Sequence, residues 1–299
     1  SCPISRGSVT RIPNSLKIEL GAEVQNGAPV CYESGLKLLE PKSNESITML
    51  DGWEMYHTNV DDAPAEILVD LGVAMQAPDS KRPWLLWMWL YLKSPDDDGF
   101  STDGEEPLLN EIEDSFIDPV ELTTKATLVG RITTCGRREF YFYCESNEGF
   151  EDSIAEAMQA FEDYEYEIGE NEDSEWSHYT SVLYPEPENI LEIMNIRGIE
   201  QLSEAGDPLT TLRTVDHHAS FRNVQDRAEF VAAALAAGFT RQGEEQCAEP
   251  DEELPFEVTL QRNHAVDEMT INEMTFIVFD LAIEHQGQYE GWGSTPVPM

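Results

Sequence analysis

The stretch Leu209–Gln242, with the sequence LTTLRTVDHHASFRNVQDRAEFVAAALAAGFTRQ, decides the fold of the last third of the chain. Its first part, Leu209–Ala219, predicts a strand that follows the turn-forming residues Gly206-Asp207-Pro208. Asn223 is a suitable N-cap for a helix that Gly238 would end. The apolar residues of that helix share one face: Val224, Ala228, Val231 and Leu235.

The residues after this helix complete a regular pattern. Two short strands, Phe239–Gln242 and Phe256–Asn263, flank an acidic loop at Glu244–Glu253. A helix follows, which Gly287 stops, and Gln288–Ser294 predicts a last strand. The order β-α-β-β-α-β is that of the split βαβ, or ferredoxin-like, sandwich. The apolar face of the second helix contains Met274, Ile277, Val278 and Leu281.

The sequence before this β-α-β-β-α-β pattern predicts a separate α+β domain with an antiparallel sheet. A hairpin is indicated around Gly136-Arg137-Arg138, and Pro119 is expected to end or bend the first helix. We therefore expect an α+β protein with two domains, at 49–184 and 208–299, joined by a connector helix within 185–207. The expected strands are Trp53–Val60, Ala65–Met75, Trp84–Lys93, Ala126–Cys135, Glu139–Glu145, Tyr164–Ile168 and Trp176–Tyr184, and the expected helices contain Leu109, Ile112 and Phe116, then Ile154, Met158 and Phe161.

Net charge is the most unusual property of the composition. The 299 residues contain 59 acidic and 18 basic side chains, a net charge of −41. Residues 1–48 hold five of each sign, so the excess lies entirely in 49–299. Residues 139–196 contain 17 acidic residues and neither lysine nor arginine. This charge disfavours nucleic acids and anionic membranes as partners and favours basic ones; a face kept negative for solubility or in a salty cytoplasm is the alternative.

Residues 1–48 differ from the rest in composition. They are rich in Ser, Asn, Gly and Pro, and we expect a flexible extension, or sequence translated upstream of a start at Met49. A short hairpin over Leu16–Glu23 and Ala28–Leu39 is the alternative. No apolar run is long enough to span a membrane. The five cysteines (Cys2, Cys31, Cys135, Cys144 and Cys247) lack CxxC spacing, which argues against a disulfide framework and fits the cytoplasm.

Two stretches suggest a metal site on first inspection. Asp96-Asp97-Asp98-Gly99 fails the spacing of a calcium-binding EF-hand loop in either register. His217 and His218 are adjacent on a predicted strand, so their side chains point to opposite faces and cannot share an ion. His217 has the parity of Val215 and Ala219 and is expected on the core side. We therefore predict no metal and no other cofactor.

Catalytic motifs do not occur in the chain. There is no GxSxG, P-loop or GxGxxG sequence, and no cysteine lies near a histidine along the chain. We expect a protein that is not an enzyme, with no catalytic residue. Gly291-Trp292-Gly293 stands out in a predicted strand, where the tryptophan would be a packing plug or an exposed contact.

These last residues carry a resemblance. The sequences LRTVDHHA (Leu212–Ala219), AAGF at 236–239 and YEGWG at 289–293 resemble the bacterial family regulator of ribonuclease E activity B, RraB. The resemblance covers about residues 208–299. Residues 50–200, with Trp53-Glu54-Met55-Tyr56 and the tryptophan-rich strand at 84–90, resemble domain of unknown function 695, which implies no activity.

The RraB resemblance implies a small, acidic, cytoplasmic protein with a ferredoxin-like fold. Such proteins bind the non-catalytic scaffold region of ribonuclease E and reduce RNA cleavage by altering the degradosome. The family-motif positions, which are candidates for partner binding, are His217, His218, Gly291, Trp292 and Gly293. The acidic docking candidates are Glu170, Glu172, Asp173, Glu175, Asp251, Glu252 and Glu253.

Three hypotheses follow. The first is a non-catalytic regulator, for which ribonuclease E is the expected partner, that docks a basic protein segment electrostatically and contacts neither nucleic acid nor membrane. The second makes the N-terminal domain a small-molecule or enzymatic module, because its region at Trp84, Trp87 and Trp89 is rich in aromatic residues. A buried strand is the favoured explanation of these residues, because aromatic residues are enriched in strands. The third is nucleic-acid mimicry, which needs carboxylates regularly spaced on one rigid face.

Overall fold

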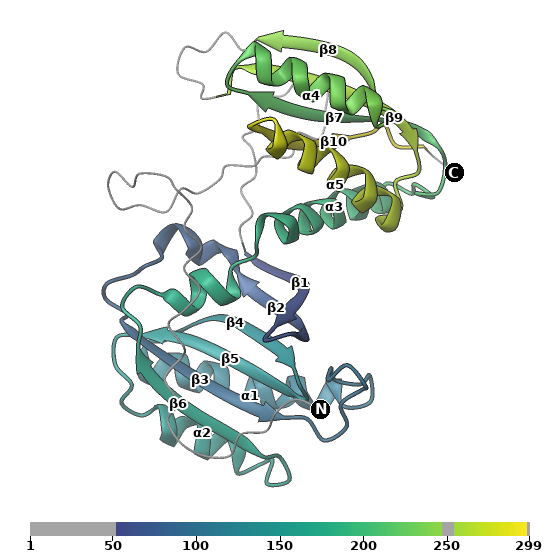
Figure 1. The fold of residues 1–299 in the computed structure, drawn as a ribbon. Coiled ribbons are helices and arrows are strands. Elements are labelled where there is room, and N and C mark those ends of the chain that lie inside the picture. Colours follow the sequence, from purple (N-terminus) through teal and green to yellow (C-terminus); the bar gives the residue numbers. More distant parts are fainter. Residues whose placement is uncertain (1–51, 247–253, 298–299) are drawn as a thin grey trace. The chain divides into compact units, whose positions relative to one another are not determined.

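The computed structural model describes residues 52–246 and 254–297 and places them in two antiparallel sheets with five α-helices (Figure 1). The first sheet belongs to the N-terminal region and the second to the C-terminal region. The elements before residue 185 are β1 (Trp53–Val60), β2 (Ala63–Asp70), the 3₁₀ helix η1 (Leu71–Gln76), β3 (Trp84–Tyr91), α1 (Glu106–Thr124), β4 (Thr127–Thr134), β5 (Arg137–Cys144), α2 (Phe150–Met158), β6 (Tyr166–Glu172) and the π-helical turn η2 (Tyr179–Leu183).

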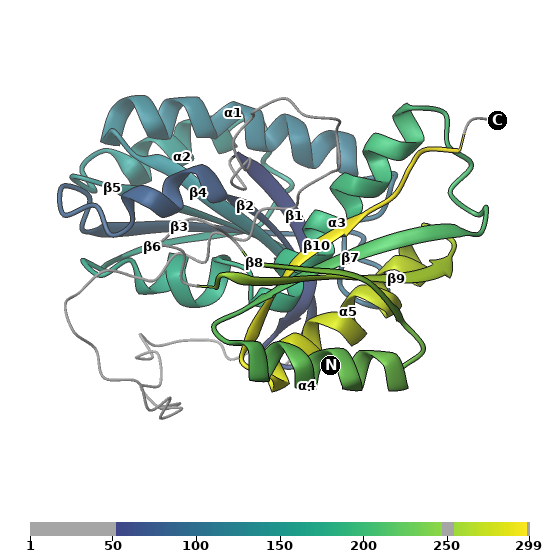
Figure 2. The same ribbon diagram turned by 90° about the horizontal axis from the view of Figure 1, so that it is seen from above.

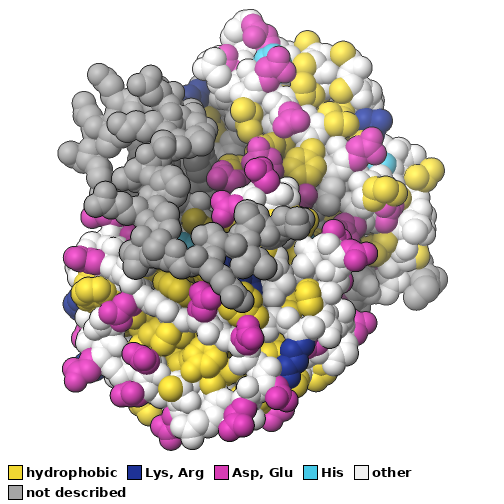
Figure 3. All heavy atoms as spheres, turned by 60° about the horizontal axis from the view of Figure 1, so that its bottom comes forward, with side chains coloured by type: hydrophobic (Ala, Val, Ile, Leu, Met, Phe, Trp, Pro, Cys, Tyr) yellow, Lys and Arg dark blue, Asp and Glu magenta, His cyan; other side chains and the backbone are white. Residues whose placement is uncertain are grey.

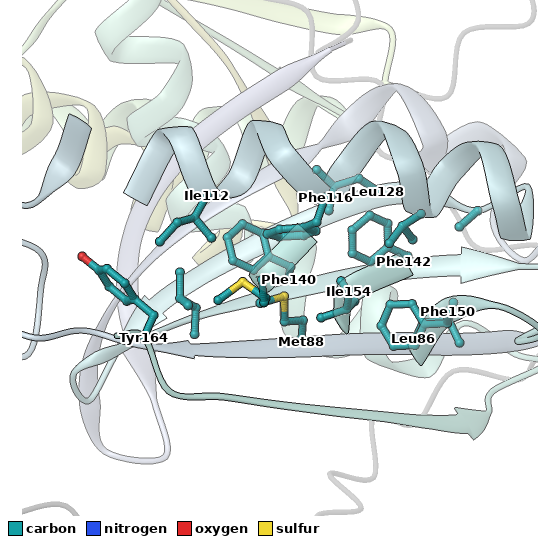
Figure 4. Packing of buried hydrophobic residues seen from close by; sticks show 14 of the residues in the cluster. Leu86, Met88, Ile112, Phe116, Leu128, Phe140, Phe142, Phe150, Ile154 and Tyr164 are labelled. Carbon is teal, nitrogen blue, oxygen red and sulfur yellow. The ribbon is translucent and has the colours of Figure 1, made fainter. Parts of the chain in front are cut away.

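The N-terminal sheet has six strands in the order β1-β2-β4-β5-β3-β6. All neighbours are antiparallel, and β6 forms one edge, paired only with β3. Helices α1 and α2 lie on one face of the sheet (Figure 2). Their apolar residues pack against alternate residues of β3 and β5, such as Met88, Phe140 and Phe142, with Phe116 and Ile154 at the centre (Figure 4). The sequence prediction of an α+β domain with an antiparallel sheet is confirmed.

The opposite face of this sheet carries a second core. The segment before α3 packs here through Trp176, Tyr179 and Leu183, which are fully buried. Their spacing of three and four residues is helical. Asp173 accepts hydrogen bonds from the backbone N–H groups of Ser177 and His178, which holds a helical turn in place. The predicted strand at Trp176–Tyr184 is therefore wrong.

Three other predicted ends differ from the structure. Pro119 does not end α1. It lies on the exposed side of the helix, and the buried residues continue past it at Val120 and Thr124. The predicted strand Ala65–Met75 stops at Asp70, whose side chain accepts a hydrogen bond from the N–H of Gly72 and starts η1. Strand β6 runs on to Glu172 because it pairs with β3 as far as Trp84.

Glu105, in the polar stretch between β3 and α1, is buried. Its carboxylate accepts hydrogen bonds from the N–H groups of Lys93 and Ser94 and from the hydroxyl of Tyr164. It therefore fastens this loop to the sheet. A buried carboxylate with three donors is stable where an unpartnered one would not be.

The predicted hairpin joins β4 to β5. Cys135 and Gly136 form its two-residue turn, and both have positive φ, at 49° and 75°. Such a turn matches the twist of the flanking strands. Cys144, the last residue of β5, is free and buried.

The C-terminal sheet has four antiparallel strands in the order β10-β7-β9-β8. The predicted β-α-β-β-α-β order is present, and Asn223 caps α4 by accepting hydrogen bonds from the N–H groups of Gln225 and Asp226. Strand β8 extends into the predicted acidic loop, because it pairs with β9 as far as Gln246. The elements are α3 (Pro187–Glu204), β7 (Arg213–Phe221), α4 (Val224–Ala236), β8 (Thr240–Gln246), β9 (Phe256–His264), α5 (Glu268–Glu284) and β10 (Gly287–Gly293).

Alternate residues of β7 and β9 face the helices α4 and α5. Ala219, Phe221, Val258 and Leu260 pack there with Phe230 of α4. Asp216 and His218 of β7 are on the other face and are partly exposed. One face of the sheet is thus core and the other is polar. The predicted extension at 1–48, with its alternative hairpin, lies outside the described residues.

Candidate functional site

The motif residues of the C-terminal region meet on two adjacent strands. Antiparallel pairing of β7 with β10 sets Trp292 opposite His217 and Gly291 opposite His218. A register shift between Tyr289 and Gly291 interrupts the pairing. His217 and Trp292 are fully buried, whereas His218 is on the other face of the sheet and partly exposed. The motif residues are therefore neighbours in the sheet, and the side chains of His217 and Trp292 face the core.

His217 belongs to a chain of hydrogen bonds in that core. Its Nδ1 lies 2.8 Å from the hydroxyl of Tyr289, and its Nε2 lies 3.3 Å from Nε2 of His264. Nδ1 of His264 lies 2.6 Å from the carbonyl oxygen of Ala265. A carbonyl oxygen only accepts, so Nδ1 of His264 carries the proton and its Nε2 accepts from His217. His217 then accepts from the hydroxyl of Tyr289, which fixes every proton in the chain.

The hydrogen-bonded side chains of His217, His264 and Tyr289 are all uncharged. Burial lowers the pKa of His217 to about 3, and burial likewise lowers the pKa of His264. Burial also holds the pKa of Tyr289 well above its usual value. A proton relay would need a group that titrates near neutral pH at a surface. The arrangement instead is typical of a polar network that fixes the geometry of a core.

Trp292 is a packing plug. Its Nε1 donates to Oδ1 of Asn195 on α3, 2.9 Å away, and Asn195 is itself completely buried. The amide of Asn195 donates in turn to Asn272 and Thr275 of α5. A Cβ added at Gly198 would lie 2.9 Å from the indole ring, so glycine is needed there. Trp292 therefore joins α3, α5 and β10, and it presents no surface to a partner.

His218 is the motif histidine that a partner could reach. Its Nδ1 lies 3.2 Å from the hydroxyl of Thr259 on β9. Beside it, Gln261 donates to the carboxylate of Asp216 at 2.7 Å, so the polar face is internally hydrogen-bonded. Gly291 and Gly293 are buried, and Gly291 has a φ of 119° at the interruption of β10.

Sequence reasoning missed His264, Tyr289 and Asn195. The predicted strand ended at Asn263, one residue short of His264. Continuing the alternation of Val258 and Leu260 would have placed His264 on the core face. Nothing local to Asn195 marks it, because its partners lie 77 to 97 residues away along the chain.

The acidic docking candidates lie at the edge of the N-terminal sheet. Glu170 and Glu172 are exposed on β6, and Glu175 is exposed after it. Asp173 is occupied within the fold, because it accepts a hydrogen bond from the Tyr143 hydroxyl in addition to the two backbone N–H groups. These hydrogen bonds lower the pKa of Asp173 against the opposing effect of burial. The remaining candidates, Asp251, Glu252 and Glu253, lie outside the described residues.

A hollow of about 510 Å³ opens beside β6. It is lined by carboxylates of two elements, Glu151 and Asp152 at the start of α2 and Glu170 on β6, together with Phe150 and Ile168. Acidic side chains outnumber lysine and arginine on the face that Figure 3 shows. Over residues 52–246 and 254–297, no group of three His, Cys, Asp or Glu side chains could hold a metal ion. No helix in that part of the chain could cross a membrane.

Exposed carboxylates occur on every helix, including Glu111 on α1, Glu188 on α3, Glu229 on α4 and Glu273 on α5. They do not form one regular row on one rigid face. The hypothesis of nucleic-acid mimicry, which requires such a row, therefore loses its premise.

The three tryptophans of β3 divide between the faces of the sheet. Trp84 packs against the core under α1 and α2. Trp87 and Trp89 are on the other face and partly exposed, with ring centroids 4.8 Å apart. Arg137 lies over the ring of Trp89, 4.3 Å from its centroid, and pairs with the buried carboxylate of Glu139.

Comparison with known proteins gives two family matches. Residues 51–184 match the family of unknown function DUF695, and residues 192–294 match the family described as regulator of ribonuclease activity B. The order and location agree with the resemblance seen in the sequence, and the second match begins inside α3. No curated protein matches the chain. Among solved structures, an unknown protein from Galdieria sulphuraria matches at 8% identity with a TM-score of 0.19, over 70% of this chain and 98% of that chain.

Proposed function

The chain carries a DUF695 region followed by an RraB region, and from this premise we propose that it is a non-catalytic regulator of ribonuclease E. It acts by binding a basic segment of the enzyme's non-catalytic scaffold region. The observation that carries the proposal is the RraB match in a chain whose net charge is −41. The negative charge of the protein disfavours contact with RNA bound to the enzyme. A basic protein segment is therefore the suitable partner.

The acidic edge around β6 supports docking there. Most cations of this region already have partners: Arg131 and Arg138 pair with carboxylates of α1, and Lys125 pairs with Glu145. Glu170 and Glu172 project from an edge strand in a stretch without lysine or arginine. Such a surface raises the encounter rate with a cationic segment and sets its register.

We further propose that the C-terminal region is ferredoxin-like and that the protein works in the cytoplasm. The strand order β10-β7-β9-β8, with α4 and α5 packed on one face, supports the first statement. The second rests on the RraB match, because that resemblance implies cytoplasmic proteins. Fractionation of cells that express a tagged chain tests it.

Binding to ribonuclease E tests the proposal. Calorimetry would titrate the full chain with the scaffold region of the enzyme at low, physiological and high salt. We expect binding that weakens steeply with salt, because exposed charges are screened beyond about 8 Å at physiological ionic strength. No binding at low salt would contradict the proposal.

Charge-reversal variants locate the docking face. Glu170→Lys with Glu172→Lys reverses two carboxylates on β6, and Glu111→Lys with Asp118→Lys makes the same change of charge on exposed positions of α1. We expect the first pair to weaken scaffold binding more than the second. Equal weakening would mean that net charge matters and the β6 edge does not.

A thermal-shift screen against metabolites tests the non-catalytic part of the proposal. The hollow beside β6 is lined by three carboxylates, which repel anionic metabolites. We therefore expect no shift with anionic metabolites. A reproducible stabilisation by one compound would instead support the small-molecule module suggested by the tryptophans of β3.

A further inference from the structure

Three aromatic side chains of β3 form a partly exposed row on the face of the sheet opposite α1 and α2. We call Trp87, Trp89 and Tyr91 the aromatic floor. Alternate residues of a strand point to the same face, which brings these three rings together. On the neighbouring strand β6, Glu167 is directly opposite Trp89 and Gly169 is directly opposite Trp87.

Glycine at position 169 lets the floor extend to the edge of the sheet. A Cβ at Gly169 would lie 2.2 Å from the ring of Trp87, so the indole occupies the space of a side chain on β6. Trp87 thereby reaches the edge strand, where a partner has access. Glycine in a strand often marks such a close approach.

The floor already holds one guanidinium. Arg137 stacks over Trp89 at 4.3 Å, and its charge is balanced by Glu139. Cation–π attraction is strongest for tryptophan, and a planar guanidinium suits it better than an ammonium. The intramolecular contact shows which chemistry this surface accommodates.

The carboxylate of Glu167 lies at the rim of the aromatic floor. Glu167 is exposed and accepts a hydrogen bond from the Tyr91 hydroxyl at 2.9 Å. In the part of the chain that the structure describes, neither lysine nor arginine forms an ion pair with it. An arriving guanidinium could therefore stack on the floor and pair with Glu167 at the same time.

We propose that the aromatic floor, with Glu167, is a recognition site for arginine side chains of a basic protein segment. The site distinguishes arginine from lysine by stacking, whereas the surrounding carboxylates attract both. This inference rests on the proposed function for the identity of the partner and refines it to arginine-rich segments that cross β3 and β6.

The test uses the full chain and two fluorescent probes, deca-arginine and deca-lysine, in anisotropy titrations. The wild type is expected to bind deca-arginine more tightly, by about three- to tenfold. Trp87→Leu with Trp89→Leu should bring the two affinities within twofold of each other, with little change for deca-lysine. Trp53→Leu, at an exposed position of β1, is the matched control and should keep the preference. A double variant that keeps the wild-type preference overturns the proposal.

A second pair of variants serves if the tryptophan variants lose their far-ultraviolet circular dichroism, which reports the backbone fold. Glu167→Gln and Glu111→Gln remove the same charge, the first from the rim of the aromatic floor and the second from an exposed position of α1. Glu167→Gln should weaken deca-arginine binding at least threefold more than Glu111→Gln, and equal weakening overturns the proposal. The two proposals can fail separately, because the probes are peptides. Loss of the arginine preference would not contradict binding to ribonuclease E, and the arginine preference can be measured even if ribonuclease E does not bind.

Discussion

Trp292 shows at the scale of one residue how a family motif can be structural. Its indole is completely buried, and its N–H satisfies Asn195, which also binds α5. A tryptophan between two glycines could equally be an exposed contact when only its neighbours in sequence are known. The deciding information, the glycine at position 198 and the amide at 195, comes from a helix almost 100 residues earlier.

Replacing this indole tests the plug. Trp292→Phe leaves Oδ1 of Asn195 without its donor and opens a cavity, so we expect a loss of about 2–4 kcal/mol in the free energy of unfolding. Trp53→Phe, at a position with 44% exposure, should change it by less than about 0.5 kcal/mol. Urea unfolding measures both, and similar small losses would refute the buried role.

Acid should destabilise the C-terminal core through His217. The unfolded histidine binds a proton near pH 6.5, whereas burial lowers the folded pKa to about 3. The unfolded state therefore binds more protons in this window, so stability is full above pH 6.5 and falls as the pH decreases towards 3. The slope from His217 is about 1.4 kcal/mol per pH unit.

The variant His217→Gln removes that slope. Urea unfolding at pH 7.5, 6.0 and 5.0 in high salt should show a weaker pH dependence for the variant than for the wild type. Identical slopes would show that His217 titrates normally in the folded state. High salt is needed because protonation of the many carboxylates changes repulsion at the same time.

At the scale of elements, β6 combines an acidic edge with a close approach. Gly169→Ala would force its methyl group into the ring of Trp87, and we expect a loss of about 1–3 kcal/mol in unfolding free energy. Gly243→Ala on β8 meets no atom within 4 Å and is the control, with an expected change under about 0.5 kcal/mol. Urea titration followed by tryptophan fluorescence distinguishes them; an unaffected Gly169→Ala would show that Trp87 lies elsewhere.

Elements were predictable from sequence where the pattern was local. Strand β1 matches its predicted bounds, and the cap at Asn223 forms as expected, because both depend on adjacent residues. The segment at 176–184 was mistaken for a strand because its aromatic residues have high strand propensity. Its helical turn depends on Asp173, whose carboxylate accepts hydrogen bonds from the backbone N–H groups of Ser177 and His178.

The candidate site was predictable in part for the same reason. Opposite faces for His217 and His218 follow from strand alternation, and the structure agrees. Which face meets a partner does not follow from alternation, because it depends on the helices that cover the sheet. The pairing of Glu139 with Arg137 and the stacking of Arg137 on Trp89 required the register of β3 against β5.

At the scale of the whole molecule, charge repulsion opposes folding. A net charge of −41 in 299 residues favours expanded states over compact ones. Added sodium chloride screens this repulsion, so the melting temperature should rise by several degrees between low and physiological salt. Calorimetry checks the direction; a falling melting temperature would show that ion pairs inside the fold outweigh the repulsion.

We propose that the protein controls ribonuclease E through the enzyme's scaffold region and not through its active site. The most direct measurement is the cleavage rate of a fluorogenic RNA by full-length ribonuclease E and by the enzyme lacking its scaffold region, each with and without the protein. We predict that the protein slows the full-length enzyme and leaves the truncated enzyme unchanged. Equal inhibition of both, or of neither, would contradict it.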